Sequence, residues 1–234
     1  LNYRNENATG HILTIEDPLE FLHAHKLSVV DQREVGIDTH SYEEALKNAL
    51  REAPDVIMIG EIRDRNTMKQ AIAYAETGHL CLSTLHANNA NQAMERVINF
   101  FPEEAHRQLL VDLSLNLAGV VSQRLIPGLH EKLVPAVEVM LNSSYISDLI
   151  AKGEFSGIKE AMARSTEIGM CTFDQALYQL YTEDRISLDE ALHNADSRTD
   201  LALRIRLAAG VSTQDAGDLS IDTSSPIQSA ARLA

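Results

Sequence analysis

Hydrophobic residues fall along this chain in short uninterrupted runs and in stripes at helical spacing. The runs predict strands over residues 11–17, 28–30, 55–59 and 79–85. The stripes predict helices over residues 41–51, 66–75, 88–99 and 103–117. Two further strands are expected over residues 119–126 and 133–140, around a Pro-Gly turn signal. Strands that alternate with helices in this way predict an α/β fold with a mostly parallel sheet.

The strand over residues 55–59 has the most strongly marked end. A run of Val, Ile, Met and Ile between Pro54 and Gly60 is typical of a strand that is buried on both faces. Ligands of open α/β sheets bind outside the carboxyl ends of such strands, and Glu61 lies at this end. Glu61 is therefore the first candidate for chemistry, and a solvated charge at a strand end is the alternative.

Beyond residue 142 the pattern predicts helices alone. They are expected over residues 147–151, 157–163, 172–182, 187–194 and 198–209. The segment after Gly210 is rich in Ser, Thr, Asp and Ala, has little apolar periodicity, and is expected to be disordered. The expected organisation is a core over residues 1–142, a helical region over 143–209 and a disordered tail over 210–234.

Charge and cysteine content restrict the class of protein. The formal net charge of −14 argues against a dedicated nucleic-acid binder, which needs a clustered basic face. Cys81 and Cys171 lie far apart without C-x-x-C spacing, so a zinc ribbon or disulfide framework is not expected and a reduced, cytosolic setting is favoured. No apolar run approaches the roughly 18 residues that a transmembrane helix requires.

Ionisable side chains follow three of the predicted strands. They are Glu16, Asp17 and Glu20 after the first, Glu61 after another and His86 after a third. If these strands are neighbours in a parallel sheet, their ends converge on one edge. Carboxylates at that edge can hold Mg²⁺ directly or through water, and one of them can orient or deprotonate an attacking water. A histidine beside them can donate a hydrogen bond to a phosphoryl oxygen.

The remaining candidates each have a structural alternative. His79 and His86, taken singly, are more often structural histidines than functional ones. A zinc site built from the two is disfavoured, because no further ligand lies at suitable spacing. Arg33 and Arg63 are candidate phosphate clamps, and solvated surface arginines are the alternative. The combination and order of these groups is more specific than any one of them.

Several segments, in fixed order, resemble those of a known family. Residues 15–20 (Ile-Glu-Asp-Pro-Leu-Glu) resemble the acidic "Asp box" of the type II/IV secretion ATPase superfamily. Residues 54–64 resemble its atypical Walker B motif, and residues 77–87 its "His box". Residues 32–36 (Gln-Arg-Glu-Val-Gly) match a further common stretch. The chain is therefore identified as similar to this superfamily.

Within the superfamily the chain resembles the type IV pilus retraction ATPases of the PilT/PilU group. Assembly and secretion ATPases usually carry a four-cysteine zinc insertion, which two isolated cysteines cannot build. Residues 137–142, 144–150 and 191–197 are similar to those of the accessory member of the group.

The resemblance implies a RecA-like P-loop ATPase core, with mostly parallel sheet, that uses ATP and Mg²⁺. Glu61 matches the glutamate that activates the attacking water, Glu20 a glutamate near Mg²⁺, and His86 a residue that contacts the phosphate. Supporting contacts to the nucleotide are implied for Glu16, Asp17, His79, Arg33 and Arg63. Glu20 and Glu61 are the residues expected to hold Mg²⁺, directly or through water.

The resemblance also implies a homo-hexameric motor that retracts type IV pili and supports twitching motility. Its implied partners are a paralogous retraction ATPase and an inner-membrane pilus platform protein, and its implied place is the cytoplasm beside the inner membrane. One alternative is an accessory or non-catalytic subunit that co-assembles with a paralogue. Another is a type II secretion or pilus assembly ATPase.

One expected feature is absent from the sequence. The chain contains no G-x-x-x-x-G-K-[ST] segment, so the phosphate-cradling loop is expected upstream, in a longer protein. These residues alone are therefore expected to bind ATP poorly and to hydrolyse it slowly.

Overall fold

The structure is a computed structural model that describes residues 1–208, and its first part is built on a parallel sheet. The sheet has the order β2-β1-β3-β4 and consists of β1 (Gly10–Glu16), β2 (Ser28–Glu34), β3 (Val56–Ile59) and β4 (Leu80–Ser83). All three strand pairs are parallel, which confirms the predicted α/β fold. The second strand continues four residues beyond its predicted end at Val30.

Helices connect and follow these strands. Those of the first part are α1 (Asn2–Asn7), α2 (Tyr42–Ala49), α3 (Arg65–Glu76), α4 (Ala90–Asn99) and α5 (Glu103–Asn116), with a 3₁₀ turn η1 (Leu50–Glu52) before β3. Those of the second part are α6 (Ser144–Lys152), α7 (Ile158–Ala163), α8 (Phe173–Thr182), α9 (Leu188–Asn194) and α10 (Arg198–Ala208), with 3₁₀ turns η2 (Phe155–Gly157) and η3 (Thr166–Ile168). Every predicted helix is present within a few residues, and α1 is an addition that the sequence pattern did not predict. The predicted disordered tail lies outside the described residues.

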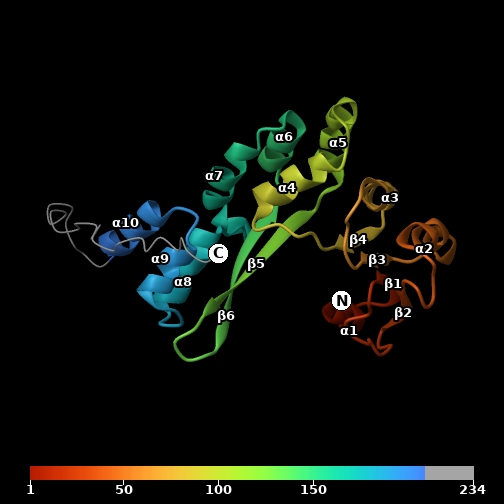
Figure 1. Ribbon diagram of the computed structural model, residues 1–234, viewed down its shortest axis with the longest axis horizontal. Coiled ribbons are helices and arrows are strands. Elements are labelled where there is room, and N and C mark those ends of the chain that lie inside the picture. Colours follow the sequence, from red (N-terminus) through yellow and green to blue (C-terminus); the bar gives the residue numbers. More distant parts are fainter. Residues whose placement is uncertain (209–234) are drawn as a thin grey trace, which may run out of the picture.

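An antiparallel hairpin lies between the parallel sheet and the last helices. It consists of β5 (Gly119–Pro127) and β6 (Leu133–Leu141), which pair along their whole length. Figure 1 shows the hairpin extending away from the parallel sheet, with α8, α9 and α10 beside it on the opposite side. The two strands predicted around Pro127 and Gly128 are therefore confirmed. Among residues 1–208, each helix is too short or too polar to span a bilayer.

Side-chain caps fix the helix starts near the strand ends. The Asp64 carboxylate accepts a hydrogen bond from the Thr67 N–H at 2.9 Å and so caps α3, which begins at Arg65. The predicted cap at Ser41 accepts from the Glu44 N–H at 3.1 Å. These caps fix the residue at which α2 and α3 begin, and therefore the position of the loops that precede them.

The hydrophobic core does not divide at the predicted boundary. One cluster joins Leu13 of β1 to Ile150 of α6, and a second joins Ile126 of β5 to Phe173 of α8. Both clusters therefore contain residues from either side of residue 142. The division into a core and a helical region at that position stays a prediction.

The two faces of the parallel sheet differ in how well they are covered. One face carries Leu13 and Ile57, which are fully buried under α2 and α3. The other face carries Leu80 and Leu82 of β4, whose side chains are 45% and 38% exposed. Within the described residues β4 is also an edge strand. The sheet therefore presents an open apolar face and edge at β4, whereas a small cluster of β1, β2 and β3 residues on the same face is buried.

A buried carboxylate links the hairpin to the first part of the chain. Glu138 of β6 is buried, and its Oε1 accepts a hydrogen bond at 2.8 Å from the Ala90 N–H at the start of α4. Burial raises the pKa of Glu138 above its ordinary value of 4.5, and the hydrogen bond from Ala90 opposes this rise.

The free energy of unfolding should fall as pH rises from 4 to 8, because Glu138 loses its proton. We expect this fall to be smaller in Glu138→Gln. The folded protein binds the Glu138 proton more tightly than the unfolded chain does, because the folded pKa is raised. The resulting stability is present below the unfolded pKa and is lost as pH rises through the folded value. Gln keeps an oxygen acceptor for Ala90 but does not titrate. Urea unfolding across this pH range measures the slope, with exposed Glu95→Gln as control. An unchanged slope in Glu138→Gln would contradict the prediction.

Candidate active site at the carboxyl edge of the sheet

The carboxyl ends of β1, β3 and β4 meet at one edge of the parallel sheet. The three strands are adjacent and parallel, in the order β1-β3-β4. Glu16 ends β1, Glu61 follows β3 after Gly60, and His86 follows β4 after a short extended segment. The predicted convergence of these three strand ends is therefore confirmed, while the roles of their side chains stay predictions.

Glu61 lies at the centre of this edge. Its side chain is 15% exposed, and its Oε2 accepts a hydrogen bond from Arg63 Nε at 2.7 Å. Its Oε1 lies 3.1 Å from Nε2 of His86, whose side chain is 78% exposed. Hydrogen bonding to Glu61 raises the pKa of the Arg63 guanidinium. One half-buried carboxylate thus lies between an arginine donor and a histidine ring, both of them exposed.

The backbone before Glu61 is held by close packing. A Cβ added to Gly60 would lie 3.2 Å from the Cα of Glu16 and 3.2 Å from the hydroxyl oxygen of Tyr42. The Gly60 N–H donates to the Ile15 carbonyl at 2.8 Å, and the Thr84 hydroxyl donates to the Gly60 carbonyl at 2.5 Å. Glycine is therefore needed here because β1 approaches closely, and these contacts fix the position of Glu61.

Tyr42 is a site residue that the sequence did not single out. Its pKa is raised above 10.0, first by burial and then by the nearby Asp17 carboxylate, and the Glu61 backbone N–H opposes the rise. Tyr42 is the first residue of α2 and belongs to none of the motifs. No signal in the sequence could have placed it beside Glu61, because the contact depends on how α2 packs over β1.

Glu16 orders the loop that follows β1. Its side chain is buried, and its Oε1 accepts a hydrogen bond from the Thr14 hydroxyl at 2.7 Å. Its Oε2 accepts from the Glu20 N–H at 3.4 Å. The Glu20 and Asp17 residues are exposed on this loop. Glu16 therefore positions the loop, whereas Glu20 and Asp17 are free to contact a ligand.

Two of the predicted nucleotide-binding residues have side-chain partners away from Glu61. His79 precedes β4 and lies at the opposite end of that strand, about 13 Å from the carboxyl edge at the usual strand rise. Its Nδ1 lies 3.0 Å from the Thr77 hydroxyl. Arg33 forms an ion pair with Glu52, on η1. Both side chains have structural partners within the chain, and a role at the nucleotide stays a prediction for each.

The strand-end carboxylates fit Mg²⁺ only with the help of other ligands. Mg²⁺ prefers oxygen ligands and usually keeps several waters beside one or two carboxylates and the substrate phosphates. In the part of the chain that the structure describes, the group of three possible ligands found within 4.8 Å of one another lies elsewhere and includes His11. Glu20 and Glu61 are thus suited to an ion that is bound mainly through water and phosphate.

A shallow hollow lies beside this edge on the open face of the sheet. Its lining residues are Leu1, His23, Met58, Leu82, Ser83 and Thr84. Met58 and Leu82 are opposite one another on β3 and β4, and Thr84 is the residue that holds Gly60. The hollow is therefore continuous with the backbone that positions Glu61.

Known proteins match nearly all of the described chain. The family described as "Type II/IV secretion system protein" matches residues 1–200. The type IV pilus ATPase PilU of Pseudomonas aeruginosa is 59% identical over 221 residues, which cover 94% of this chain and 57% of that protein. The type IV pilus retraction ATPase PilT of the same bacterium is 40% identical over 195 residues, which cover 83% of this chain and 57% of that protein.

A solved structure also resembles the fold. The crystal structure of the pilus retraction motor PilT with bound ADP has a TM-score of 0.79 and 39% sequence identity. The match covers 86% of this chain and 57% of that one. This chain therefore spans little more than half the length of the relatives that it matches.

Proposed function

We propose, on the premise that this chain belongs to the family of type II/IV secretion system proteins, that the protein containing it hydrolyses ATP to drive type IV pilus retraction. The observation that carries the proposal is the position of Glu61 at the carboxyl edge, between Arg63 and His86. Its support from similarity is the 59% identity to a type IV pilus ATPase. The expected cellular outcome is twitching motility.

In the proposed reaction Glu61 accepts the proton of the water that attacks the γ-phosphate of ATP. One carboxylate oxygen accepts from Arg63 Nε and the other lies 3.1 Å from His86 Nε2, so the water must take the place of one of these two groups. His86 is the group that can move, because its side chain is 78% exposed on a loop. Once displaced, its imidazole can donate to a phosphoryl oxygen and stabilise the charge that develops there.

The residues around Glu61 take supporting roles in this proposal. Glu20 and Glu61 are the residues that would hold Mg²⁺ through water, and a bound ion would supply positive charge beside the phosphates. Glu16 fixes the loop that carries Asp17 and Glu20 through its bond to the Glu20 N–H. Arg63 orients the Glu61 carboxylate through Nε. His79 and Arg33 are proposed to contact the nucleotide itself and are given no role at the Glu61 carboxylate.

The open apolar face and edge of β4 support a further part of the proposal. Leu80 and Leu82 are exposed on an edge strand, and such surfaces are normally covered by another segment or chain. We infer that a segment of the longer protein, with the phosphate-cradling loop, packs here beside Glu61. Nucleotide binding and hydrolysis are therefore properties that we assign to the longer protein.

The assembly and location of the motor are inferred from the family resemblance. We infer a homo-hexamer in the cytoplasm, at the inner membrane, that works with a paralogous retraction ATPase and an inner-membrane pilus platform protein. The support is the similarity of this chain to proteins named as a type IV pilus ATPase and a pilus retraction motor.

A gene deletion tests the direction of the motor. We expect the deletion strain to keep pili on its surface and to lose twitching, because extension would continue without retraction. Loss of surface pili, or of secretion with normal twitching, would instead indicate an assembly or secretion ATPase. Electron microscopy of pili and the diameter of twitching zones are the measurements, and complementation with the full gene is the control.

The main alternative is an accessory subunit without catalysis of its own. The sequence basis for it is the segment over residues 144–150, which differs from that of the principal retraction ATPases. The structure places this segment in α6, where Ile146, Leu149 and Ile150 are buried in the core. Hydrolysis by the purified full-length protein without its paralogue would exclude this alternative, and activity only in the mixture would favour it.

A further inference from the structure

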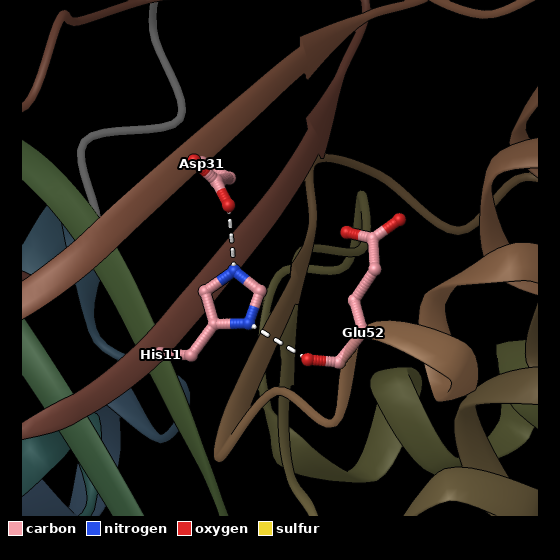
Figure 2. Close-up of side chains that lie close together, drawn as sticks. All are labelled: His11, Asp31 and Glu52. Carbon is pink, nitrogen blue, oxygen red and sulfur yellow. Dashed lines mark hydrogen bonds and ion pairs between the residues drawn. The ribbon is translucent and has the colours of Figure 1, made fainter.

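A second group of ionisable side chains lies away from the carboxyl edge. His11 is the second residue of β1, Asp31 lies on β2, and Glu52 is the last residue of η1. Possible ligand atoms of all three residues lie within 4.8 Å of one another. Figure 2 shows the His11 ring between Asp31 and Glu52. Glu16 lies five residue steps after His11, which places this cluster about 16 Å from the end of β1.

The parallel register explains why His11 and Asp31 meet. Residue Leu13 pairs with Asp31, and His11 pairs with Val29, so the two side chains share one face of the sheet two positions apart. The distance between His11 Nε2 and Asp31 Oδ2 is 2.9 Å. Glu52 approaches the same ring from η1.

Both ring nitrogens of His11 face oxygen acceptors. Nδ1 lies 3.3 Å from the main-chain oxygen of Glu52, and Nε2 lies 2.9 Å from Asp31 Oδ2. A neutral imidazole has only one N–H and can satisfy only one of these acceptors. The second contact requires either a second proton or a metal ion at the other nitrogen. Histidines that bind metals usually donate their other N–H to an oxygen such as a backbone carbonyl, as Nδ1 can do here.

We propose that His11, Asp31 and Glu52 form a binding site for a divalent transition-metal ion, of which Zn²⁺ is the best fit. Nε2 of His11 and one oxygen of each carboxylate are the ligands. A site that combines an imidazole with carboxylates suits Zn²⁺, whereas Mg²⁺ prefers oxygen ligands. Asp31 is 54% exposed, so water can complete the coordination.

The geometry requires only a small rearrangement. Bonds of about 2.1 Å in a tetrahedral site place the ligand atoms about 3.4 Å apart. The contact between His11 and Asp31 is already close to this distance, and Glu52 must approach further. Its side chain is 30% exposed and has three rotatable bonds, so it can move without disturbing η1.

Arg33 competes with the metal ion for Glu52. Its guanidinium forms an ion pair with the Glu52 carboxylate, and it also places a positive charge beside the proposed site. Removal of that charge should therefore strengthen metal binding. A cluster that is merely structural has no reason to respond in this way. The bound ion would join β1, β2 and η1 and stabilise the folded state, because the unfolded chain does not hold the three ligands together.

The test is a titration of the full-length protein with ZnCl₂. The buffer contains millimolar MgCl₂, so that Mg²⁺ occupies the sites that prefer oxygen ligands. We expect one Zn²⁺ per chain by calorimetry, and a Tm higher by about 5–10 °C at about 100 times Kd. Asp31→Asn should weaken binding at least about tenfold, since it replaces a charged ligand with a neutral one on an exposed residue. Arg33→Gln should strengthen it.

The control is His130→Gln, because His130 is exposed in the turn of the hairpin. It should leave Zn²⁺ affinity unchanged, and circular dichroism should show that every variant is folded. The absence of Zn²⁺ binding by the unsubstituted protein would overturn the proposal. Unchanged affinity in both Asp31→Asn and Arg33→Gln would do the same, since the bound ion would then lie elsewhere.

Discussion

Glu61→Gln is expected to lower ATP turnover by about 10²–10⁴-fold in the full-length protein, the usual contribution of general base catalysis. Gln has the shape of Glu and keeps an oxygen that can accept from Arg63 Nε, so the loop geometry should persist. It cannot accept a proton from the attacking water. Nucleotide affinity should therefore change little, and the effect should appear in kcat rather than in KM.

Steady-state release of phosphate at several ATP concentrations measures this effect. The matched control is Glu95→Gln, because Glu95 is an exposed residue on α4 that loses the same charge. The control should keep wild-type turnover. If turnover in Glu61→Gln stays within about twofold of wild type, Glu61 is not the general base, because that role predicts a much larger effect.

Gly60→Ala is expected to lower kcat by about 100-fold, because a shift of about 1 Å in a catalytic group can cost this much. The added Cβ would lie 3.2 Å from the Cα of Glu16 and 3.3 Å from the Ile15 carbonyl, both backbone atoms of β1. Backbone in the middle of a sheet cannot move aside cheaply. The loop after Gly60 must shift instead, and it carries Glu61 with it.

Gly157→Ala is a matched control for this prediction. Its added Cβ would also meet a neighbour at 3.2 Å, but that neighbour is Leu149 Cδ2, the end of a flexible side chain. Gly157→Ala should therefore keep full turnover. Both variants should remain folded by circular dichroism. Full activity in a folded Gly60→Ala protein would show that Glu61 does not depend on this close approach.

The main frame of the site could be predicted from the sequence. The apolar run before Gly60 indicates a strand buried on both faces, and β3 is the strand between β1 and β4. The rule that parallel strands present their carboxyl ends at one edge then places Glu61 near His86. The strand order agrees with this placement, and the two side chains lie 3.1 Å apart.

Contacts between elements could not be predicted, because they depend on register and packing. Tyr42 reaches the site only because α2 packs over β1. The meeting of His11 and Asp31 depends on the pairing of β1 with β2. The position of His79 at the amino edge follows from its place before β4, and its contact with the nucleotide stays a prediction.

The helix α1 was also not predicted, because it lacks an apolar stripe. It is held by tertiary contacts of Asn5, a buried polar residue. The side-chain amide of Asn5 donates to the Ala24 carbonyl at 2.8 Å, and the main-chain oxygen of Asn5 accepts from the Leu27 N–H at 2.9 Å. Partners some twenty residues away thus stabilise a short helix whose own sequence gives no periodic signal.

The central claim is that Glu61 performs the hydrolytic step in a site that still binds nucleotide without it. The most direct measurement is chromatographic analysis of the nucleotide bound to full-length Glu61→Gln after incubation with ATP and Mg²⁺. We predict intact ATP on the variant and ADP on the wild-type protein. Recovery of ADP from the variant, formed at the wild-type rate, would contradict the claim.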